Sequence, residues 1–343
     1  MEIDLGAGYA QAQQPFPTAV HPFDYQRPTT YAAALERLAQ PGTLPMAGGT
    51  DLLVLVKEGL AEPNLVVDVR SLPGARELKV SADGARIGAA VRVAELATDE
   101  RILARYPLLA EACASVGTTA LRSMGTIGGN LCQRPHCWYF RRRISCYKNG
   151  GHACPAEHGE NQHLAILGGG PCYAVHPSDP AVALTALDAT VEVLGRRGPR
   201  RIPIGRFFPS PRERVEAETA LDSGELVVAI ELPAESAGGW QRYHKVMQRA
   251  AWDFALVSLA AQMRRDGSVR LVLGGVAPFP WRLAAEVERD VAAGMLGDDV
   301  ATLADRALYD ARPLTHNRYK VGLAAALLRR AARDIRRETD ALS

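Results

Sequence analysis

The chain has 343 residues and a mass of 36.9 kDa, and 47% of its residues are hydrophobic and 23% charged. This balance excludes a disordered or fibrous protein and supplies enough apolar residues for about two domains. With 40 Lys and Arg against 38 Asp and Glu, the formal charge is +2, which gives no long-range field to favour nucleic acid or an anionic membrane as a partner.

Residues 1–22 have the composition of a flexible arm. The stretch is rich in Gln, Ala, Gly and Pro, carries Glu2 and Asp4 where a secretory signal has Lys or Arg, and contains no apolar core. Elsewhere no run reaches the ~20 apolar residues that a membrane span needs. We therefore expect no membrane span and a cytoplasmic location, or a periplasmic one through co-export with a partner that carries a signal.

The next hundred residues alternate between helical and strand patterns. Apolar spacing predicts a helix from Thr29 to Gln40, then a strand over LPMA, a glycine turn, and a buried helix over TDLLVLVKEGL. NLVVDV and ARIGAAV are typical of strands, and AELATDERILARYPLLAEACASV predicts one or two amphipathic helices. The chain therefore starts as a mixed α and β protein.

An unusual segment follows at about 133–172. Five of the six cysteines lie between Cys132 and Cys172, in the spacing C-x4-C-x8-C-x7-C-x17-C, among histidines, arginines and aromatic residues. This composition indicates an inserted metal-binding loop.

The sequence after the insertion contains the end of one predicted domain and the whole of a second one. PCYAVHPSDPAVALTALDATVEVLG predicts a strand, a proline-marked turn, a helix and another strand, and the first domain ends near Gly205. A variable stretch, 206–224, is expected to act as a linker. Residues 225–343 then form an α+β domain, with strands over ELVVAIEL, YHKVMQR and VRLVLGGVA and helices near 283–295, 298–308 and 317–337.

Two glycine motifs suggest anion binding. In MAGGTDL, Met46 to Leu52, two glycines precede a helix, so that backbone N–H groups can converge on a phosphate. TTALRSMGTIGGNLCQ, Thr118 to Gln133, contains a second pair of glycines followed by Asn130. Asp179, in HPSDPAVAL, is placed to cap a helix or to accept hydrogen bonds from sugar hydroxyls. The dinucleotide fingerprint of the Rossmann fold is absent, so nucleotide binding would use another fold.

MAGGTDL, TIGGNL, SDPAVAL and the YHKV strand together resemble the FAD-binding subunit of the xanthine dehydrogenase and molybdenum hydroxylase family, from about Phe23 to the C-terminus. The cysteine-rich insertion resembles members with an additional [4Fe–4S] cluster, the bacterial periplasmic-type aldehyde oxidoreductases and 4-hydroxybenzoyl-CoA reductase. The resemblance implies an α+β fold: a PCMH-type FAD-binding domain of two α/β subdomains over 23–205, then a smaller C-terminal domain like that of the CO dehydrogenase flavoprotein.

The resemblance also implies a set of FAD-binding residues. In the first glycine motif and the strand before it these are Leu44, Pro45, Met46, Ala47, Gly48, Gly49, Thr50, Asp51 and Leu52. In the second motif they are Thr118, Thr126, Gly128, Gly129 and Asn130, and further along the chain Asp179, Leu226 and Lys245. Asp179 would meet ribityl or ribose hydroxyls, Leu226 would pack near a ring of FAD, and Lys245 would offset phosphate charge.

A [4Fe–4S] cluster takes four thiolates, so one of the five clustered cysteines is surplus. Position and resemblance favour Cys137, Cys146, Cys154 and Cys172, and a competing set replaces Cys172 by Cys132. Zinc remains a rival metal, since four thiolates, or three and a histidine, can hold it. Cys113 is expected to be buried and inert. The basic and aromatic residues of QRPHCWYFRRRISCYKN would stabilise the charge of a cluster and shield it.

No nucleophile, base and orienting group occur together, so no catalytic residue is predicted and the chemistry belongs to cofactors. The resemblance implies an electron-transfer subunit of an aldehyde oxidoreductase. A large molybdenum-cofactor subunit and a small [2Fe–2S] subunit would complete a heterotrimer or a dimer of heterotrimers, and FAD would pass electrons to an external acceptor. The corresponding subunit of a 4-hydroxybenzoyl-CoA reductase-like or xanthine dehydrogenase-like complex is the alternative. A stand-alone FAD oxidase and a zinc-stapled binding module are the rival classes.

Overall fold

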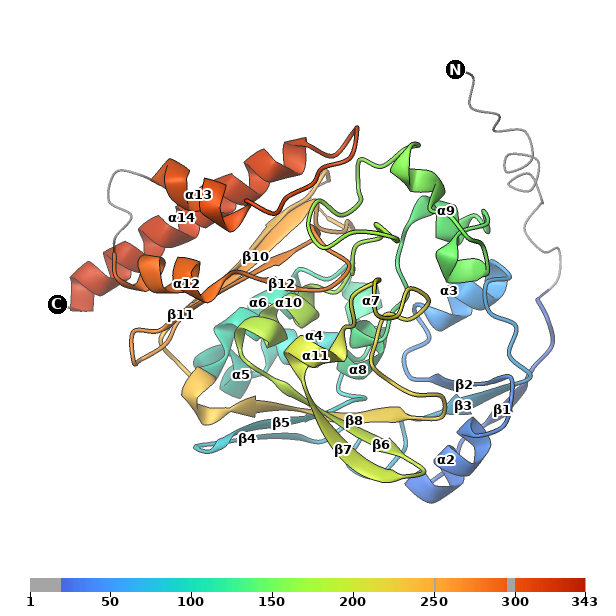
Figure 1. Ribbon diagram of the computed structural model, residues 1–343. Helices are drawn as coiled ribbons and strands as arrows, with labels where there is room; N and C mark the ends of the chain where they lie inside the picture. Colours follow the sequence, from blue (N-terminus) through green and yellow to red (C-terminus); the bar gives the residue numbers. More distant parts are fainter. Residues whose placement is uncertain (1–19, 250, 295–299, 343) are drawn as a thin grey trace, which may run out of the picture.

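The computed structural model describes residues 20–249, 251–294 and 300–342 (Figure 1). Most of the predicted arm, residues 1–19, lies outside the described residues. Three sheets organise the described chain: a three-stranded sheet, a five-stranded sheet and a four-stranded sheet. In Figure 1 the two larger sheets lie on either side of a layer of short helices.

The three-stranded sheet has the order β1-β3-β2 and is parallel throughout. Its strands are β1 (Asp24–Gln26), β2 (Thr43–Met46) and β3 (Leu65–Asp68). Helices α2 (Tyr31–Leu38) and α3 (Leu52–Lys57) lie between successive strands, as the apolar spacing predicts. Thr30 caps α2 by accepting a hydrogen bond from the Ala33 N–H group.

The five-stranded sheet is antiparallel, in the order β4-β5-β8-β6-β7. Its strands are β4 (Leu78–Ser81), β5 (Gly84–Gly88), β6 (Thr190–Gly195), β7 (Gly198–Pro203) and β8 (Leu226–Pro233). Strand β8, predicted to open the C-terminal domain at residue 225, instead lies at the centre of this sheet between two hairpins. The boundary is corrected accordingly: the first sheet ends at Pro233, because β8 pairs with β5 and β6 and with no strand of the third sheet.

Short helices fill the middle layer: α4 (Val93–Thr98), α5 (Glu100–Arg105), α6 (Pro107–Ala114), α7 (Thr119–Met124), α8 (Ile127–Leu131), α10 (Asp179–Ala186) and α11 (Ile204–Phe207). All eight residues of α10 are buried. A helix that is buried on every side must have elements packed all around it, and α10 indeed contacts α6 and α8 as well as β10 and β11 of the third sheet.

The four-stranded sheet, β12-β11-β10-β9, is also antiparallel. Its strands are β9 (Trp240–Val246), β10 (Val257–Met263), β11 (Val269–Gly274) and β12 (Trp281–Arg282), and the helices packed with it are α12 (Ala285–Ala292), α13 (Val300–Ala307) and α14 (Tyr319–Leu342). In Figure 1 the long α14 runs beside this sheet. Strand β10 is buried at all seven positions, so it has no alternation that would reveal it in the sequence.

The insertion contains only single turns: α9 (Trp138–Arg141), and two 3₁₀ turns, η1 (Tyr147–Asn149) and η2 (Pro155–Glu157). The prediction of a strand over PCYAV is wrong, because residues 171–175 form no strand pairing. None of the helices in the described part of the chain is long and apolar enough to cross a membrane.

Candidate functional site

The two glycine motifs lie against each other. A Cβ atom on Gly48 would collide with the carbonyl oxygen of Met124, so only glycine allows this approach of two backbones. Gly49 has a φ of +73°, a conformation that L side chains rarely adopt. The Ala47–Thr50 turn is therefore built for close backbone packing, with its N–H groups between β2 and α3.

The second glycine motif forms two short helices, α7 and α8. Gly128, Gly129 and Asn130 belong to α8, and Thr126 caps that helix by accepting a hydrogen bond from the Gly129 N–H group. Thr118 caps α7 in the same way through the Leu121 N–H group. Gly128 is packed against Ala89, where a Cβ atom would have no room.

The second motif is tied to the turn that begins α10. The Ser178 hydroxyl donates a hydrogen bond to the side-chain oxygen of Asn130 and accepts one from the Ala181 N–H group. Ser178, and not Asp179, is therefore the residue that caps α10. The carboxylate of Asp179 remains available for other partners.

Those partners are Lys245 and Tyr243, both on β9. The Asp179 carboxylate lies 2.8 Å from the Lys245 ammonium and accepts a 2.7 Å hydrogen bond from the Tyr243 hydroxyl. The Lys245 ammonium also donates to the Ser115 carbonyl oxygen. Burial raises the pKa of Asp179, and the charge of Lys245 opposes that rise. The structure thus brings two predicted site residues together, and their individual roles toward FAD stay predictions.

The other predicted FAD residues lie on elements of the two other sheets and on α3. Leu44, Pro45 and Met46 belong to β2, which leads into the first glycine turn, and Leu52 begins α3 behind it. Leu226, on β8, is buried in a cluster formed by α2, β3 and neighbouring loops. Asp51 contacts the insertion: its carboxylate accepts hydrogen bonds from the Arg134 N–H group at 2.8 Å and from the Arg141 guanidinium at 2.7 Å.

A cavity of about 430 Å³ lies between the insertion, the turn before α10 and the loop between β9 and β10. Asp179, Ser178 and His176 line one side, and Cys137 and Trp138 line another. Burial lowers the pKa of His176 to about 4, so its ring is neutral at ordinary pH. This cavity therefore joins the turn before α10 to Cys137 of the insertion.

Cys137, Cys146, Cys154 and Cys172 line one small cavity together. Cys137, Cys146 and Cys154 are each the residue before a helical turn, α9, η1 and η2 respectively. The sulfur of each of these three cysteines accepts hydrogen bonds from backbone N–H groups of the turn that follows it. The Cys172 sulfur accepts one from the Ala174 N–H group. Burial nevertheless raises the pKa of every one of these thiols, that of Cys137 to about 11.

The cavity between the four thiols measures about 10 Å³, the space of a single water molecule. Within the ranges that the structure describes, no group of three or more His, Cys, Asp or Glu side chains stands close enough to hold a metal ion. Tyr139, Phe140 and Tyr147 also line the cavity, together with Lys148, Pro155 and Ala174, so three aromatic rings lie around the sulfurs.

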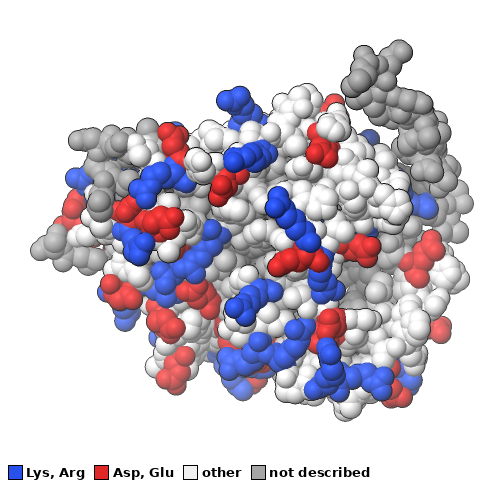
Figure 2. All heavy atoms as spheres, viewed as in Figure 1, with Lys and Arg blue, Asp and Glu red and all other residues white. Residues whose placement is uncertain are grey.

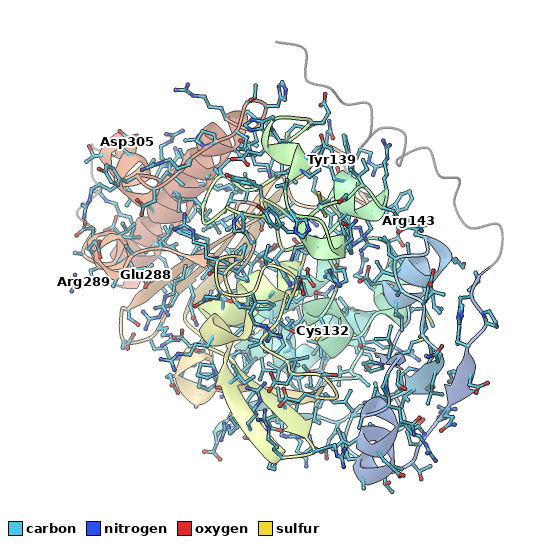
Figure 3. All side chains as sticks on the ribbon, turned by 45° about the vertical axis from the view of Figure 1, so that its right-hand side comes forward. Cys132, Tyr139, Arg143, Glu288, Arg289 and Asp305 are labelled. Atoms are coloured by element: carbon cyan, nitrogen blue, oxygen red, sulfur yellow. The ribbon has the colours of Figure 1, made fainter. Side chains whose placement is uncertain are left out.

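Cys132 does not line this cavity. It follows α8 and packs against the helical core, and burial raises its pKa to about 12. Figure 3 shows it well apart from Tyr139, which does line the cavity. Cys113 is fully buried in α6.

Sequence reasoning named Lys148 only among the basic residues of the insertion, and it missed two contributors to this region, His176 and Glu218. Lys148 lines the cysteine cavity, and its ammonium lies 2.7 Å from the Glu218 carboxylate. Glu218 belongs to 206–224, which was expected to be only a linker. No local pattern in the sequence could reveal a pairing across 70 residues, because it depends on how the two segments fold together.

Comparison with known proteins identifies the family of the chain. Residues 21–235 match the family model of the FAD binding domain in molybdopterin dehydrogenase. The chain is 40% identical to the aldehyde oxidoreductase FAD-binding subunit PaoB of Escherichia coli, over 89% of this chain and 96% of that protein. It is 29% identical to the glyceraldehyde dehydrogenase medium chain of Sulfolobus acidocaldarius, over 81% and 84% of the two chains.

The solved structures support the fold. Carbon monoxide dehydrogenase from Hydrogenophaga pseudoflava matches with a TM-score of 0.71 and 24% identity, over 94% of this chain and 99% of that one. Quinoline 2-oxidoreductase from Pseudomonas putida matches with a TM-score of 0.69 and 22% identity, over 96% and 100%. The predicted fold class is confirmed. The chain belongs to the family of FAD-binding domains of the molybdopterin dehydrogenases, a family of oxidoreductase subunits.

Proposed function

We propose that this chain is the FAD- and [4Fe–4S]-carrying electron-transfer subunit of a molybdenum-dependent aldehyde oxidoreductase. The observation that carries the proposal is the set of four cysteines that line one cavity beside the flavin-binding segments. FAD and the cluster would supply the redox chemistry, and this chain would bind them, orient them and exclude water.

The residues fit FAD at the predicted positions. Gly48 and Gly128 allow close backbone approach at the two motifs, and the Asn130–Ser178 hydrogen bond fixes the second motif to the turn before α10. Asp179, which forms a buried pair with Lys245, lines the 430 Å³ cavity, where its carboxylate can meet polar groups of a ligand. We assign FAD to the space between the two glycine motifs and this cavity.

The donor set also fits a cluster. Four thiolates are the ligands of a [4Fe–4S] centre, and each binds a different iron, so they stand further apart than the ligands of a single zinc ion. N–H groups directed at sulfur favour the thiolate form and stabilise cluster charge. A cluster needs more room than about 10 Å³, so its binding would require the segments that carry the four cysteines to move apart. The rings of Tyr139, Phe140 and Tyr147 would keep water from the iron.

The relatives suggest the reaction and the partners. One relative is named as a subunit of an aldehyde oxidoreductase and another as the medium chain of a glyceraldehyde dehydrogenase. By analogy, a large molybdenum-cofactor subunit would oxidise an aldehyde to a carboxylic acid, and a small [2Fe–2S] subunit would pass the electrons to FAD here, in a heterotrimer or a dimer of heterotrimers. An external acceptor would then take them. A subunit of a 4-hydroxybenzoyl-CoA reductase-like or xanthine dehydrogenase-like complex is the alternative.

The metal content of anaerobically purified protein tests the cluster. We expect about four irons and four acid-labile sulfides per chain, the content of one such cluster, together with one FAD. One zinc and no iron would contradict the electron-transfer role of the insertion. Aldehyde-dependent bleaching of the flavin in the complex with its subunits, but not in the isolated chain, would exclude a stand-alone oxidase.

Single cysteine variants test the ligand set. Cys172→Ser should lose most of the iron and its visible absorption, because a cavity ligand is removed. Cys132→Ser is the matched control and should keep iron at the wild-type level, because Cys132 lies outside the cavity. Loss of iron in Cys132→Ser with retention in Cys172→Ser would establish the competing set.

A further inference from the structure

The segment 206–224 folds over the cysteine insertion. The Lys148 ammonium donates a 2.9 Å hydrogen bond to the Val215 carbonyl oxygen and forms an ion pair with Glu218 at 2.7 Å. The other carboxylate oxygen of Glu218 lies 2.7 Å from the Arg134 guanidinium. Arg134, at the start of the insertion, and Lys148, in its middle, are therefore joined through Glu218 to the segment 206–224.

These charges are withdrawn from solvent. The side chains of Lys148 and Glu218 are only 7% and 8% exposed. A buried charge acts on its surroundings more strongly than a surface charge, because the effective dielectric constant is lower and salt does not screen it. Removing two charges from water costs free energy that can cancel their mutual attraction. Stabilisation of the fold is therefore not a sufficient explanation for a buried ion pair at this place.

Lys148 is directed at the cysteines. It stands two residues after Cys146 and lines the same cavity as Cys137, Cys154 and Cys172. Glu218 holds the Lys148 ammonium from the far side and is absent from the cavity lining. The cavity thus has a positive group at its wall and a negative group one layer behind it.

Resting on the proposed cluster, we propose that the Lys148–Glu218 pair sets the reduction potential of that cluster. On reduction the cluster gains one electron and no atom, so its charge becomes more negative by one. The ammonium of Lys148 favours the reduced form, and the carboxylate of Glu218 opposes it. Both are positioning residues that act through the field at the sulfurs, and neither is a ligand.

Variants of opposite charge provide the test. In the anaerobically purified full-length chain, dithionite titration followed by electron paramagnetic resonance gives the midpoint potential of the cluster. Lys148→Met should lower the midpoint potential, and Glu218→Gln should raise it. At a fixed potential each variant should change the ratio of reduced to oxidised cluster by about tenfold. For a one-electron couple this corresponds to a shift of about 59 mV in the midpoint. Lys148→Arg keeps the charge and should keep the wild-type midpoint.

Two further variants distinguish an effect of charge on the midpoint potential from an effect of altered structure. The double variant Lys148→Met/Glu218→Gln should return toward the wild-type midpoint, because both charges are removed. Lys79→Gln, on the exposed strand β4, removes a distant charge and should leave the midpoint unchanged. The proposal is overturned, while the cluster assignment stands, if the midpoint potential shifts in the same direction in Lys148→Met and Glu218→Gln. It is equally overturned if the midpoint does not shift in variants that still bind four irons. Absence of iron in the wild type would overturn the cluster and the proposal with it.

Discussion

Buried polar side chains distinguish the start of α10 from the apolar core around it. Asp179 and Lys245 are buried on different elements, α10 and β9, and neutralise each other across the middle layer. Tyr243 donates to the same carboxylate, and burial raises the pKa of that phenol well above its ordinary value. These three side chains form one unit, so the removal of one member changes the electrostatic environment of the others.

Lys245→Met is expected to lower the free energy of unfolding by about 3–5 kcal/mol, because it leaves the Asp179 carboxylate buried without its counter-ion. Urea unfolding of the FAD-loaded and FAD-free protein measures this loss. The double variant Lys245→Met/Asp179→Asn should be milder than Lys245→Met alone, since no unpaired charge remains. Strictly additive losses would show that the two side chains are energetically independent.

At the scale of elements, local patterns predicted much of the architecture. Helices α2, α3, α10 and α14 and strands β3, β6 and β11 follow apolar periodicity or β-branched runs close to their observed bounds. Strand β10 was missed, because a short, wholly buried run of Ser, Ala, Leu and Gln carries no alternation. The sheet of β8 was predicted wrongly, because pairing between strands that are 140 residues apart leaves no local signal.

The candidate site was likewise predicted only in part. The glycine positions and the four cavity cysteines could be named from motifs and resemblance. The ion pairs Asp179–Lys245 and Lys148–Glu218 could not, since each joins segments that only the tertiary fold brings together. The sequence likewise did not indicate that TIGGNL forms the helix α8, because two glycines are unfavourable in a helix and the fold overrides that preference.

Gly48→Ala tests the contact between the glycine motifs. The new Cβ atom would meet the Met124 carbonyl oxygen, which is backbone and cannot turn aside. We expect a loss of about 1–3 kcal/mol in unfolding free energy, as for other overpacked sites, and a lower ratio of FAD to protein after gel filtration. Gly205→Ala is the control, because no atom lies within 4 Å of its Cβ position. Equal FAD retention in both variants would contradict the role of this contact.

For the whole molecule, a buried lysine connects distant segments. The Lys320 ammonium, at the start of α14, donates to the carbonyl oxygens of His163, Leu164 and Gly275. It thereby joins the end of the insertion, the turn after β11 and the C-terminal helix. Basic and acidic side chains are interspersed over the face seen in Figure 2, in agreement with the small net charge.

Lys320→Met should destabilise the protein by about 2–4 kcal/mol, because three carbonyl oxygens lose a buried donor. Burial lowers the pKa of Lys320 to about 7, whereas an unfolded lysine titrates near 10.4. Between these values the unfolded chain holds the additional proton, so wild-type stability increases with pH by up to about 1.4 kcal/mol per unit.

The stability difference between wild type and Lys320→Met should therefore widen as the pH rises from 7 to about 9. Thermal or urea unfolding at several pH values measures it. A difference that stays constant between pH 7 and about 9 would show that Lys320 is charged in the folded protein throughout this range, because folded and unfolded chains would then hold the same number of protons.

The central place of β8 has a consequence for synthesis of the chain. The β4–β5 hairpin is complete by residue 88 and the β6–β7 hairpin by residue 203, yet the two share no strand pairing until residues 226–233 arrive between them. The cysteine insertion emerges from the ribosome before this closing strand, and Glu218 precedes the strand by only eight residues. Closure of the five-stranded sheet and closure of the segment 206–224 over Lys148 therefore depend on neighbouring residues, which leave the ribosome one after the other.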